Sequence, residues 1–198
     1  MINVSRETGE LFDAYKALLS AWNPKINLVA ASTLVDFRHR HVEDCLQLAE
    51  HLPSAIKGHW VDFGSGGGLP GLVMAIFYRD MPIRFTLVES DKRKCQFLKT
   101  VVRELSLTKV QVVSDRIEKI EPFNADYASA RALAALNQLL KFVHLHLSTD
   151  GTALLMKGRS WKDEVEVARN EWQFDLEHFN STTDPEAAIL KISGVSHA

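Results

Sequence analysis

Four glycines within five residues are the feature of this sequence with the clearest chemical meaning. An apolar run at 60–63 leads into them, and Leu69-Pro70-Gly71 and a second apolar run follow. This pattern predicts a buried strand, a tight turn and the start of a helix, where an early proline is tolerated. Glycine permits positive φ and close approach of a ligand to the main chain, and a helix start offers free N–H groups. The stretch therefore predicts a nucleotide-type cofactor site in an open α/β sheet.

The glycines fit two cofactor motifs. Gly64, Gly66 and Gly68 form G-x-G-x-G, which is common in S-adenosylmethionine-dependent methyltransferases of the Rossmann-like class. Gly66, Gly68 and Gly71 form G-x-G-x-x-G, the dinucleotide motif. Both classes need an acidic residue after the next strand to hold ribose hydroxyls, and Glu89 ends the next apolar segment. The glycines alone leave both cofactors open, and the spacing to Glu89 disfavours a glycine-rich turn that binds nothing.

Length and composition indicate one globular unit. The 198 residues are 46% hydrophobic, and their net charge is −2, which disfavours indiscriminate nucleic-acid binding but leaves local basic patches open. We expect a helical extension at 1–58 and a cofactor-binding domain at 59–198, in a single compact unit. The two cysteines lie far apart, and no leader-like or membrane-length apolar run is present. A cytoplasmic location and no membrane partner are therefore expected.

Hydrophobic periodicity predicts the elements that hold this loop. One helix is expected around Leu11 to Trp22, ended by Asn23-Pro24, with helical segments after Ser32 and over 39–52. Further helices are expected at 70–78, 91–106, 117–120, 133–146 and 161–172. Strands are expected at 59–63, 84–89, 110–113, 125–129, 151–157, 173–179 and 187–192.

Alternating strands and helices imply a parallel sheet with right-handed crossovers. Only the short segment 181–185 separates the last two strands, so we expect them to pair antiparallel. The predicted fold is α/β, a Rossmann-like class I methyltransferase with a seven-stranded, mostly parallel sheet, helices on both faces and an N-terminal helical extension. A dehydrogenase would need a separate substrate domain, for which this length leaves no room. Methyl transfer is therefore favoured over hydride transfer.

An ordered set of motifs resembles the 16S ribosomal RNA guanine-N7 methyltransferase family. The resemblance spans about Leu11 to Lys157 and rests on order and spacing rather than on any single motif. The chain departs from the family at Val29, Cys45 and Ala130, and at 186–188, where the family has an R-H pair. The motifs are W-N-x-x-x-N-L at 22–28, R-H-x-x-D at 40–44, L-P-G at 69–71, K-R at 92–93, R-x-E at 116–118, A-R-A at 130–132 and K-G at 157–158.

The resemblance implies methyl transfer from S-adenosylmethionine to N7 of a guanine. Because N7 carries a lone pair and no proton, this chemistry needs no general base, no covalent intermediate and no metal. Orientation of the two reactants can supply about 7–11 kcal/mol of barrier lowering. The expected partner is 16S ribosomal RNA or the small ribosomal subunit, not DNA, and the chain is expected to be a monomer.

The resemblance also implies roles for individual residues. The cofactor would be held by Gly64, Gly66, Gly68, Leu69, Glu89, Ile117, Glu118 and Arg131. Glu89 would accept from the ribose hydroxyls, and Ile117 with Glu118 would hold the adenine. Catalysis would depend on Arg131 and Lys157. Contacts to the RNA would come from Arg40, His41, Lys92, Arg93 and Lys157.

Plainer interpretations remain open for several of these residues. Arg131 could instead pair with a buried acid, and the basic residues from Lys92 onward could form a solvated helix face. His41 and Asp44 could tie the helical extension to the sheet, or flank the mouth of the substrate site. Two other functions also remain open: a methyltransferase of the same fold that acts on another RNA or a small molecule, and a non-catalytic nucleotide-binding module.

Overall fold

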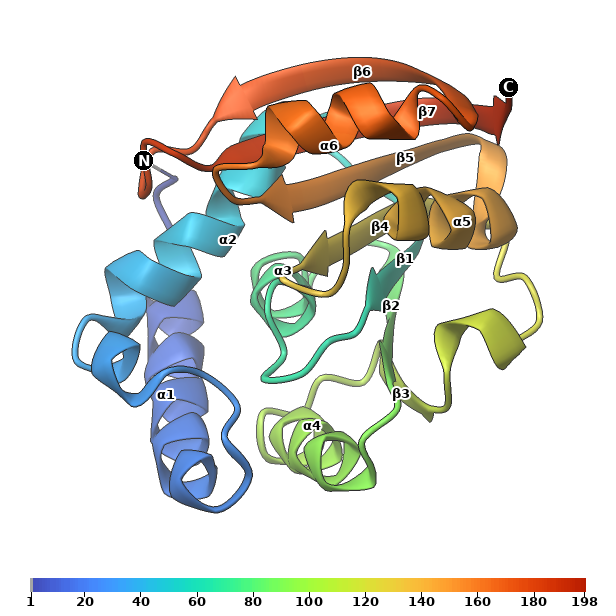
Figure 1. The fold of residues 1–198 in the computed structure, drawn as a ribbon. Coiled ribbons are helices and arrows are strands. Elements are labelled where there is room, and N and C mark those ends of the chain that lie inside the picture. The colour runs from blue at the N-terminus through green and yellow to red at the C-terminus, as the bar shows by residue number, and fades with distance from the viewer. Residues whose placement is uncertain (1) are drawn as a thin grey trace.

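One seven-stranded sheet forms the centre of the computed structural model, which describes residues 2–198 (Figure 1). The strand order is β3-β2-β1-β4-β5-β7-β6. The first five strands are parallel, whereas β7 runs antiparallel to both of its neighbours, β5 and β6. The strands are β1 (Gly58–Phe63), β2 (Ile83–Glu89), β3 (Val110–Ser114), β4 (Ala125–Arg131), β5 (Leu147–Lys157), β6 (Trp172–Asn180) and β7 (Ala188–His197).

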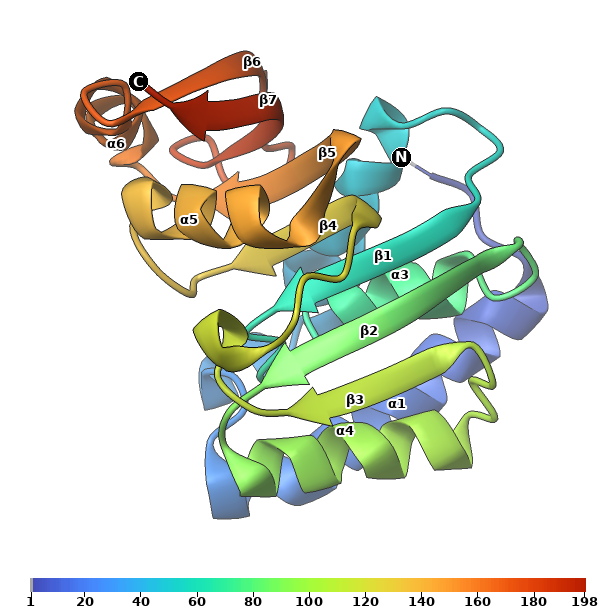
Figure 2. The same ribbon diagram turned by 90° about the vertical axis from the view of Figure 1, so that its right-hand side faces the viewer.

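Helices cover both faces of the sheet (Figure 2). One face is covered by α1 (Arg6–Ile26), α3 (Gly71–Phe77) and α4 (Lys92–Glu104), and the other by α5 (Leu136–His146) and α6 (Trp161–Ala168). Short helical turns complete the chain. They are η1 (Ala31–Leu34), η2 (Arg38–Glu43), α2 (Asp44–Leu46), η3 (Gln47–His51) and η4 (Ile117–Lys119).

Successive residues of the central strands alternate between two apolar layers. Trp60 belongs to the layer with α1, α3 and α4, whereas Val61 and Phe63 belong to the layer with α5 and α6. Leu154 and Leu155 divide in the same way. Because both faces are covered, these strands are near-continuous apolar runs, and each buried aliphatic side chain contributes about 1.5–3 kcal/mol.

The predicted α/β fold is confirmed, including the antiparallel last pair and the N-terminal helix. The end predicted for that helix is wrong, because α1 continues through Pro24 to Ile26, and Asn27 then adopts φ 48°. A proline this close to the helix end removes only one backbone hydrogen bond. The Asn23 side chain holds the following turn instead, since its Oδ1 accepts from the N–H groups of Leu28 and Val29 at 2.7 and 2.9 Å.

The segment predicted as one helix over 39–52 is a chain of short turns with π-, α- and 3₁₀-helical geometry. Its buried residues, among them Val42, Cys45 and Leu48, share an apolar core with α1 and α3. The division at residue 58 stays a proposal, and this shared core supports a single compact unit. Within residues 2–198, no helix is both long and apolar enough to span a membrane.

Candidate functional site

A cavity of about 640 Å³ opens at the carboxyl ends of β1, β2, β3 and β4. The order of the sheet reverses direction between β1 and β4, and ligands of open α/β sheets bind at such a switch point. The cavity is lined by the segments that directly follow these strands. Gly64, Gly66, Leu69, Glu89, Ile117, Glu118 and Arg131, seven of the eight residues predicted to hold the cofactor, all line it.

The glycine loop between β1 and α3 forms one wall of the cavity. Gly64, Gly66 and Gly68 all have positive φ, as the motif predicts. At Gly68 the φ is 91°, and an added Cβ would lie 2.3 Å from the Leu72 Cδ1. The hydroxyl of Tyr15 on α1 donates to the carbonyl of Gly67, so the N-terminal helix supports the loop from behind. Gly68 shapes the turn without lining the cavity itself.

Glu89 lies at the end of β2 and is 9% exposed. Its two carboxylate oxygens accept from the backbone N–H of Gly66 at 2.9 Å and of Asp91 at 2.8 Å. The side chain therefore fixes the glycine loop against the β2–α4 turn. Each carboxylate oxygen has a second acceptor site, so hydroxyl groups of a ligand in the cavity can still bind there.

Ile117 and Glu118 form the opposite end of the cavity, after β3. Ile117 is buried, and its carbonyl accepts from His146 Nε2 at 2.9 Å. Burial lowers the pKa of His146, and its unprotonated Nδ1 has no hydrogen-bond partner within residues 2–198. Neutral His146 thus supports the η4 turn from the protein interior, and Ile117 presents an apolar surface to the cavity.

Asp62, at the end of β1, neither lines the cavity nor reaches solvent. Its side chain has no exposed surface. Its Oδ1 accepts from the Ser129 hydroxyl at 2.6 Å, and that hydroxyl accepts from Trp60 Nε1 at 2.8 Å. Burial raises the pKa of Asp62 to about 6. This chain of bonds fixes β1 against β4 beneath the glycine loop.

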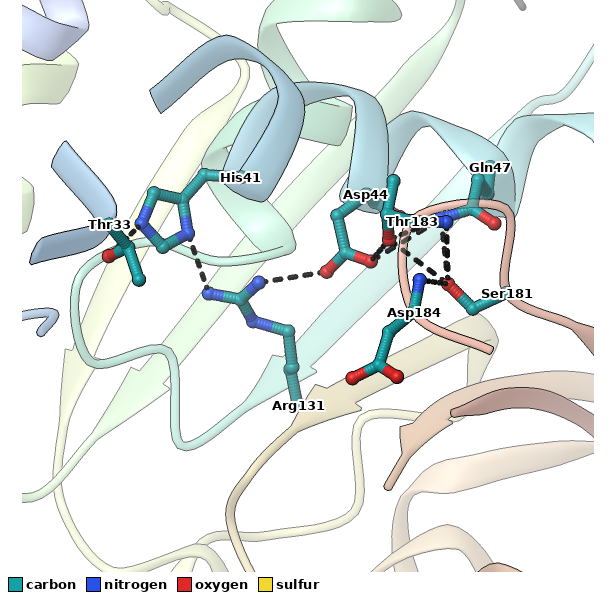
Figure 3. Close-up of polar contacts among 8 residues, drawn as sticks. All are labelled: Thr33, His41, Asp44, Gln47, Arg131, Ser181, Thr183 and Asp184. Atoms are coloured by element: carbon teal, nitrogen blue, oxygen red, sulfur yellow. Dashed lines mark hydrogen bonds and ion pairs between the residues drawn. The ribbon is translucent and has the colours of Figure 1, made fainter. Parts of the chain in front are cut away.

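Arg131 ends β4 and joins the helical extension to the sheet (Figure 3). Its guanidinium donates to Asp44 Oδ2 at 2.9 Å and to His41 Nδ1 at 3.2 Å. Burial opposes the charge of Arg131, but the neighbouring Cys45 and then Asp44 together outweigh this effect, so the pKa of Arg131 is raised. Asp44 Oδ1 in turn accepts from the Thr183 hydroxyl and from Gln47 Nε2. Arg131 does pair with an acid, although a partly buried one, and His41 and Asp44 do tie the extension to the sheet.

His41 is neutral in this cluster. Because Arg131 donates to Nδ1, the ring proton lies on Nε2, which donates to the Thr33 hydroxyl at 2.8 Å. Burial, and then the charge of Arg131, lower the pKa of His41 to about 4. The ring acts as a hydrogen-bonded spacer between β4 and the η1 turn.

A second cavity, of about 260 Å³, adjoins the first. Arg131 and Ala132 line both cavities. Its other walls come from the helical extension, the end of β5 and the β6–β7 loop. Because its volume is less than half that of the first cavity, it suits a single ring system better than a whole cofactor. Arg40, His41 and Lys157, three of the five residues predicted to contact RNA, line it.

Lys157 is largely buried, with 9% of its side chain exposed. Its ammonium donates to the Ala134 carbonyl at 2.8 Å and pairs with Glu164 at 2.7 Å. Glu164 also accepts from the N–H of Leu136 at 2.7 Å. Lys157 therefore anchors the loop after β4, and a direct contact with RNA or with the reacting atoms stays a prediction.

Lys92 and Arg93 are exposed at the start of α4 and line neither cavity. Arg93 pairs with Asp91 at 3.3 Å, so an RNA contact there also stays a prediction. Among residues 2–198, no group of three or more His, Cys, Asp or Glu side chains could hold a metal ion.

Sequence reasoning misses two residues that line the second cavity, Ser181 and Thr183, and a third, Gln47, that is bonded to them. Gln47, Ser181 and Thr183 carry no motif, yet each is bonded to the others or to Asp44. Their contacts span 134 to 139 positions of the chain. The sequence signal for these contacts is limited to the polar run 180–184, which indicates a loop before β7 with several hydrogen-bonding side chains.

A family model and individual relatives of this chain indicate the same protein family. The family model for rRNA small subunit methyltransferase G matches residues 8–189. A ribosomal RNA small subunit methyltransferase G from Paracoccus denitrificans is 51% identical over the whole of both chains. One from Ruegeria sp. is 46% identical, with 98% of this chain and 94% of that protein covered.

Solved structures share the fold at low identity. Ribosomal protein L11 methylase from Lactobacillus delbrueckii subsp. bulgaricus matches with a TM-score of 0.61 at 15% identity. Aeropyrum pernix fibrillarin, solved with natively bound S-adenosyl-L-methionine, matches with a TM-score of 0.56 at 18% identity. Each match covers 76% of both chains.

Proposed function

The chain belongs to the rRNA small subunit methyltransferase G family, and from that premise we propose that it methylates N7 of a guanine in 16S ribosomal RNA. It is an S-adenosylmethionine-dependent methyltransferase. The observation that carries the proposal is the pair of adjoining cavities, one suited to the cofactor and the other to a single base, which share Arg131 and Ala132.

The residues around the larger cavity fit S-adenosylmethionine. The glycine loop leaves main-chain groups open to a ligand, and a Cβ at Gly64 would lie 2.4 Å from Leu133 Cδ1. Glu89 retains acceptor sites for the two ribose hydroxyls, while Ile117 and Glu118 suit the adenine ring and its amine. When bound, the cofactor supplies an electrophilic methyl carbon attached to a sulfonium.

Attack by N7 requires no proton transfer. The in-plane lone pair of N7 forms the new N–C bond, the C–S bond breaks, and positive charge passes from sulfur to the purine. The chain then has to align the two reactants, and alignment can lower the barrier by about 7–11 kcal/mol. Arg131 and Ala132 form the boundary at which N7 meets the methyl group, and the bonds of Arg131 to Asp44 and His41 hold that boundary rigid.

Contacts to RNA phosphates are proposed for the exposed basic residues. Arg40 lines the smaller cavity, and its guanidinium has no ion pair or hydrogen bond within residues 2–198. It is therefore free to bind a phosphate next to the target nucleotide. Lys92 and Arg93, on α4, are proposed as weaker and more distant contacts, whose contribution falls as salt is raised.

Mass spectrometry of nucleosides from 16S RNA tests the proposal. Deletion of the gene should remove 7-methylguanosine, and the wild-type gene should restore it. A gene encoding Glu89→Ala should restore little, whereas one encoding Glu121→Ala, an exposed glutamate outside both cavities, should restore it fully. An unchanged 7-methylguanosine content after deletion would overturn the proposal.

A further inference from the structure

The smaller cavity contains a carboxylate, that of Asp184, with one oxygen that accepts no hydrogen bond from residues 2–198. Asp184 lies in the β6–β7 loop and lines this cavity but not the larger one. Its Oδ1 accepts from the N–H of Glu186 at 3.0 Å, whereas its Oδ2 makes no hydrogen bond to any residue in 2–198. Figure 3 shows its carboxylate pointing away from Ser181, toward the side of the loop on which Arg131 lies.

The other acid of this cavity is already engaged. Asp44 Oδ2 accepts from Arg131, and its Oδ1 accepts from Thr183 and Gln47. The cavity therefore presents one carboxylate with a free acceptor oxygen, on the β6–β7 loop, while Arg131 and Ala132 line its boundary with the larger cavity.

The shape of guanine matches this arrangement. Its N7 lies on one edge, and the N1–H and N2–H groups lie on the opposite side of the ring system. A base that directs N7 toward Arg131 and Ala132 presents its two adjacent N–H donors to another part of the lining, to which the β6–β7 loop contributes Asp184. A carboxylate accepts two such parallel donors, as it does with the fork of an arginine. Adenine offers no N1–H, so it cannot make this pair of bonds.

Given the proposed function, on which this step rests, we propose that Asp184 recognises the target guanine by accepting hydrogen bonds from its N1–H and N2–H groups. The same contact favours the reaction itself. As positive charge passes to the purine, these N–H groups become stronger donors, so the bond to the carboxylate strengthens in the transition state. Asp184 should therefore affect kcat as well as KM.

Asp184 also has a structural role in its loop, and one substitution separates that role from recognition of guanine. The bond from the Glu186 N–H to Oδ1 closes a local turn of the kind that aspartate and asparagine both make. In Asp184→Asn the amide oxygen can keep this turn, while the amide nitrogen replaces the free acceptor with a donor. Asp150→Asn is the matched control, since Asp150 is exposed, lines neither cavity and carries the same charge.

The test compares guanosine with inosine, which lacks the N2 amine, at the methylated position of the RNA that the wild-type protein modifies. Single-turnover rates, cofactor affinity by calorimetry and melting temperature are measured for the wild type and both variants. The wild type should methylate the guanosine RNA about tenfold faster than the inosine RNA, or more, because one bidentate contact discriminates to about this degree. Asp184→Asn should be slower on guanosine by a similar factor and should lose the discrimination. Its cofactor affinity and melting temperature should match those of Asp150→Asn.

The outcomes separate this inference from the proposed function. Absence of 7-methylguanosine from wild-type reactions would overturn the proposed function. Equal rates of N7 methylation of guanosine RNA, which gives 7-methylguanosine, and of inosine RNA, which gives 7-methylinosine, by the wild type would overturn the role of Asp184, whatever the folding of its variant. A variant that folds and keeps the wild-type preference for guanosine would overturn that role as well.

Discussion

The two adjoining cavities are built in different ways. The larger one is lined by segments that directly follow strands, and its main polar contact, between Gly66 and Glu89, spans 23 positions. The smaller one depends on side chains from distant segments. Arg131 and Asp44 are 87 positions apart, and Asp44 and Thr183 are 139 apart.

This difference has consequences for stability and function. A cavity made from main chain and one carboxylate needs few particular side chains, so most substitutions near it should change ligand binding and leave the fold intact. A cavity made by partly buried charge pairs across three segments should lose both its shape and part of the protein's stability when one partner is removed.

The largest effect is expected at Asp44. The variant Asp44→Ala leaves the guanidinium of Arg131, whose side chain is 21% exposed, without its carboxylate partner. Removal of one partner of a buried pair costs about 3–5 kcal/mol, and partial exposure places this case near 3. Urea unfolding should show this loss, whereas Asp36→Ala, an exposed change of the same charge, should stay within about 0.5 kcal/mol of the wild type. Equal stabilities of the two variants would contradict the role given to this pair.

The pH dependence of stability should reveal neutral His41. Its pKa of about 4 in the folded protein lies below the usual value near 6.5, so the unfolded chain binds more protons between these values. Stability should fall as pH drops from 6.5 toward 4, by up to about 3 kcal/mol from this residue.

His59 acts in the same direction, whereas Asp62, with its pKa raised to about 6, opposes both. The difference between variants therefore isolates His41. Denaturant melts of His41→Gln across this range should show a flatter pH dependence than the wild type, and His178→Gln, at an exposed position, should follow the wild type. Parallel curves for all three proteins would contradict a neutral, buried His41.

Substitutions in the larger cavity should weaken cofactor binding rather than lower the stability of the fold. Glu89→Ala should weaken S-adenosylmethionine binding by about 1–3 kcal/mol, because charge-assisted hydrogen bonds to the ribose are lost. Calorimetry should show a smaller loss for Glu89→Gln, which keeps one acceptor oxygen. Wild-type affinity in Glu89→Ala would remove Glu89 from the cofactor site.

The smallest effect is expected where the two cavities meet. Ala132 adopts φ 51°, a conformation that disfavours residues other than glycine. Relief of this strain should offset the entropy that glycine loses on folding, so Ala132→Gly should stay within about 0.5 kcal/mol of the wild type. Ala134→Gly, in the same loop without positive φ, should destabilise by about 0.5–1 kcal/mol. Equal losses in thermal melts would argue against strain at Ala132.

The parts that sequence reasoning predicted are those built by local patterns. The seven strands, the glycine turn and the acidic end of β2 follow from periodicity and spacing, because neighbouring residues determine them. The sequence indicates an acidic partner for Arg131 only as an alternative and does not identify it as Asp44, and it does not predict the contributions of Thr183 and Asp184. Those contacts arise only after the extension and the β6–β7 loop pack against the sheet. The end of α1 was misplaced because the buried side chain of Asn23 compensates for Pro24.

The most direct measurement supplies the purified protein with S-adenosylmethionine labelled in its methyl group and 16S RNA from cells that lack the gene. Nucleoside mass spectrometry then locates the label. We expect it on N7 of a guanosine and expect Glu89→Ala to reduce it strongly. Label on another atom or another nucleoside, or none on RNA while the cofactor is bound, would contradict the assignment of the two cavities.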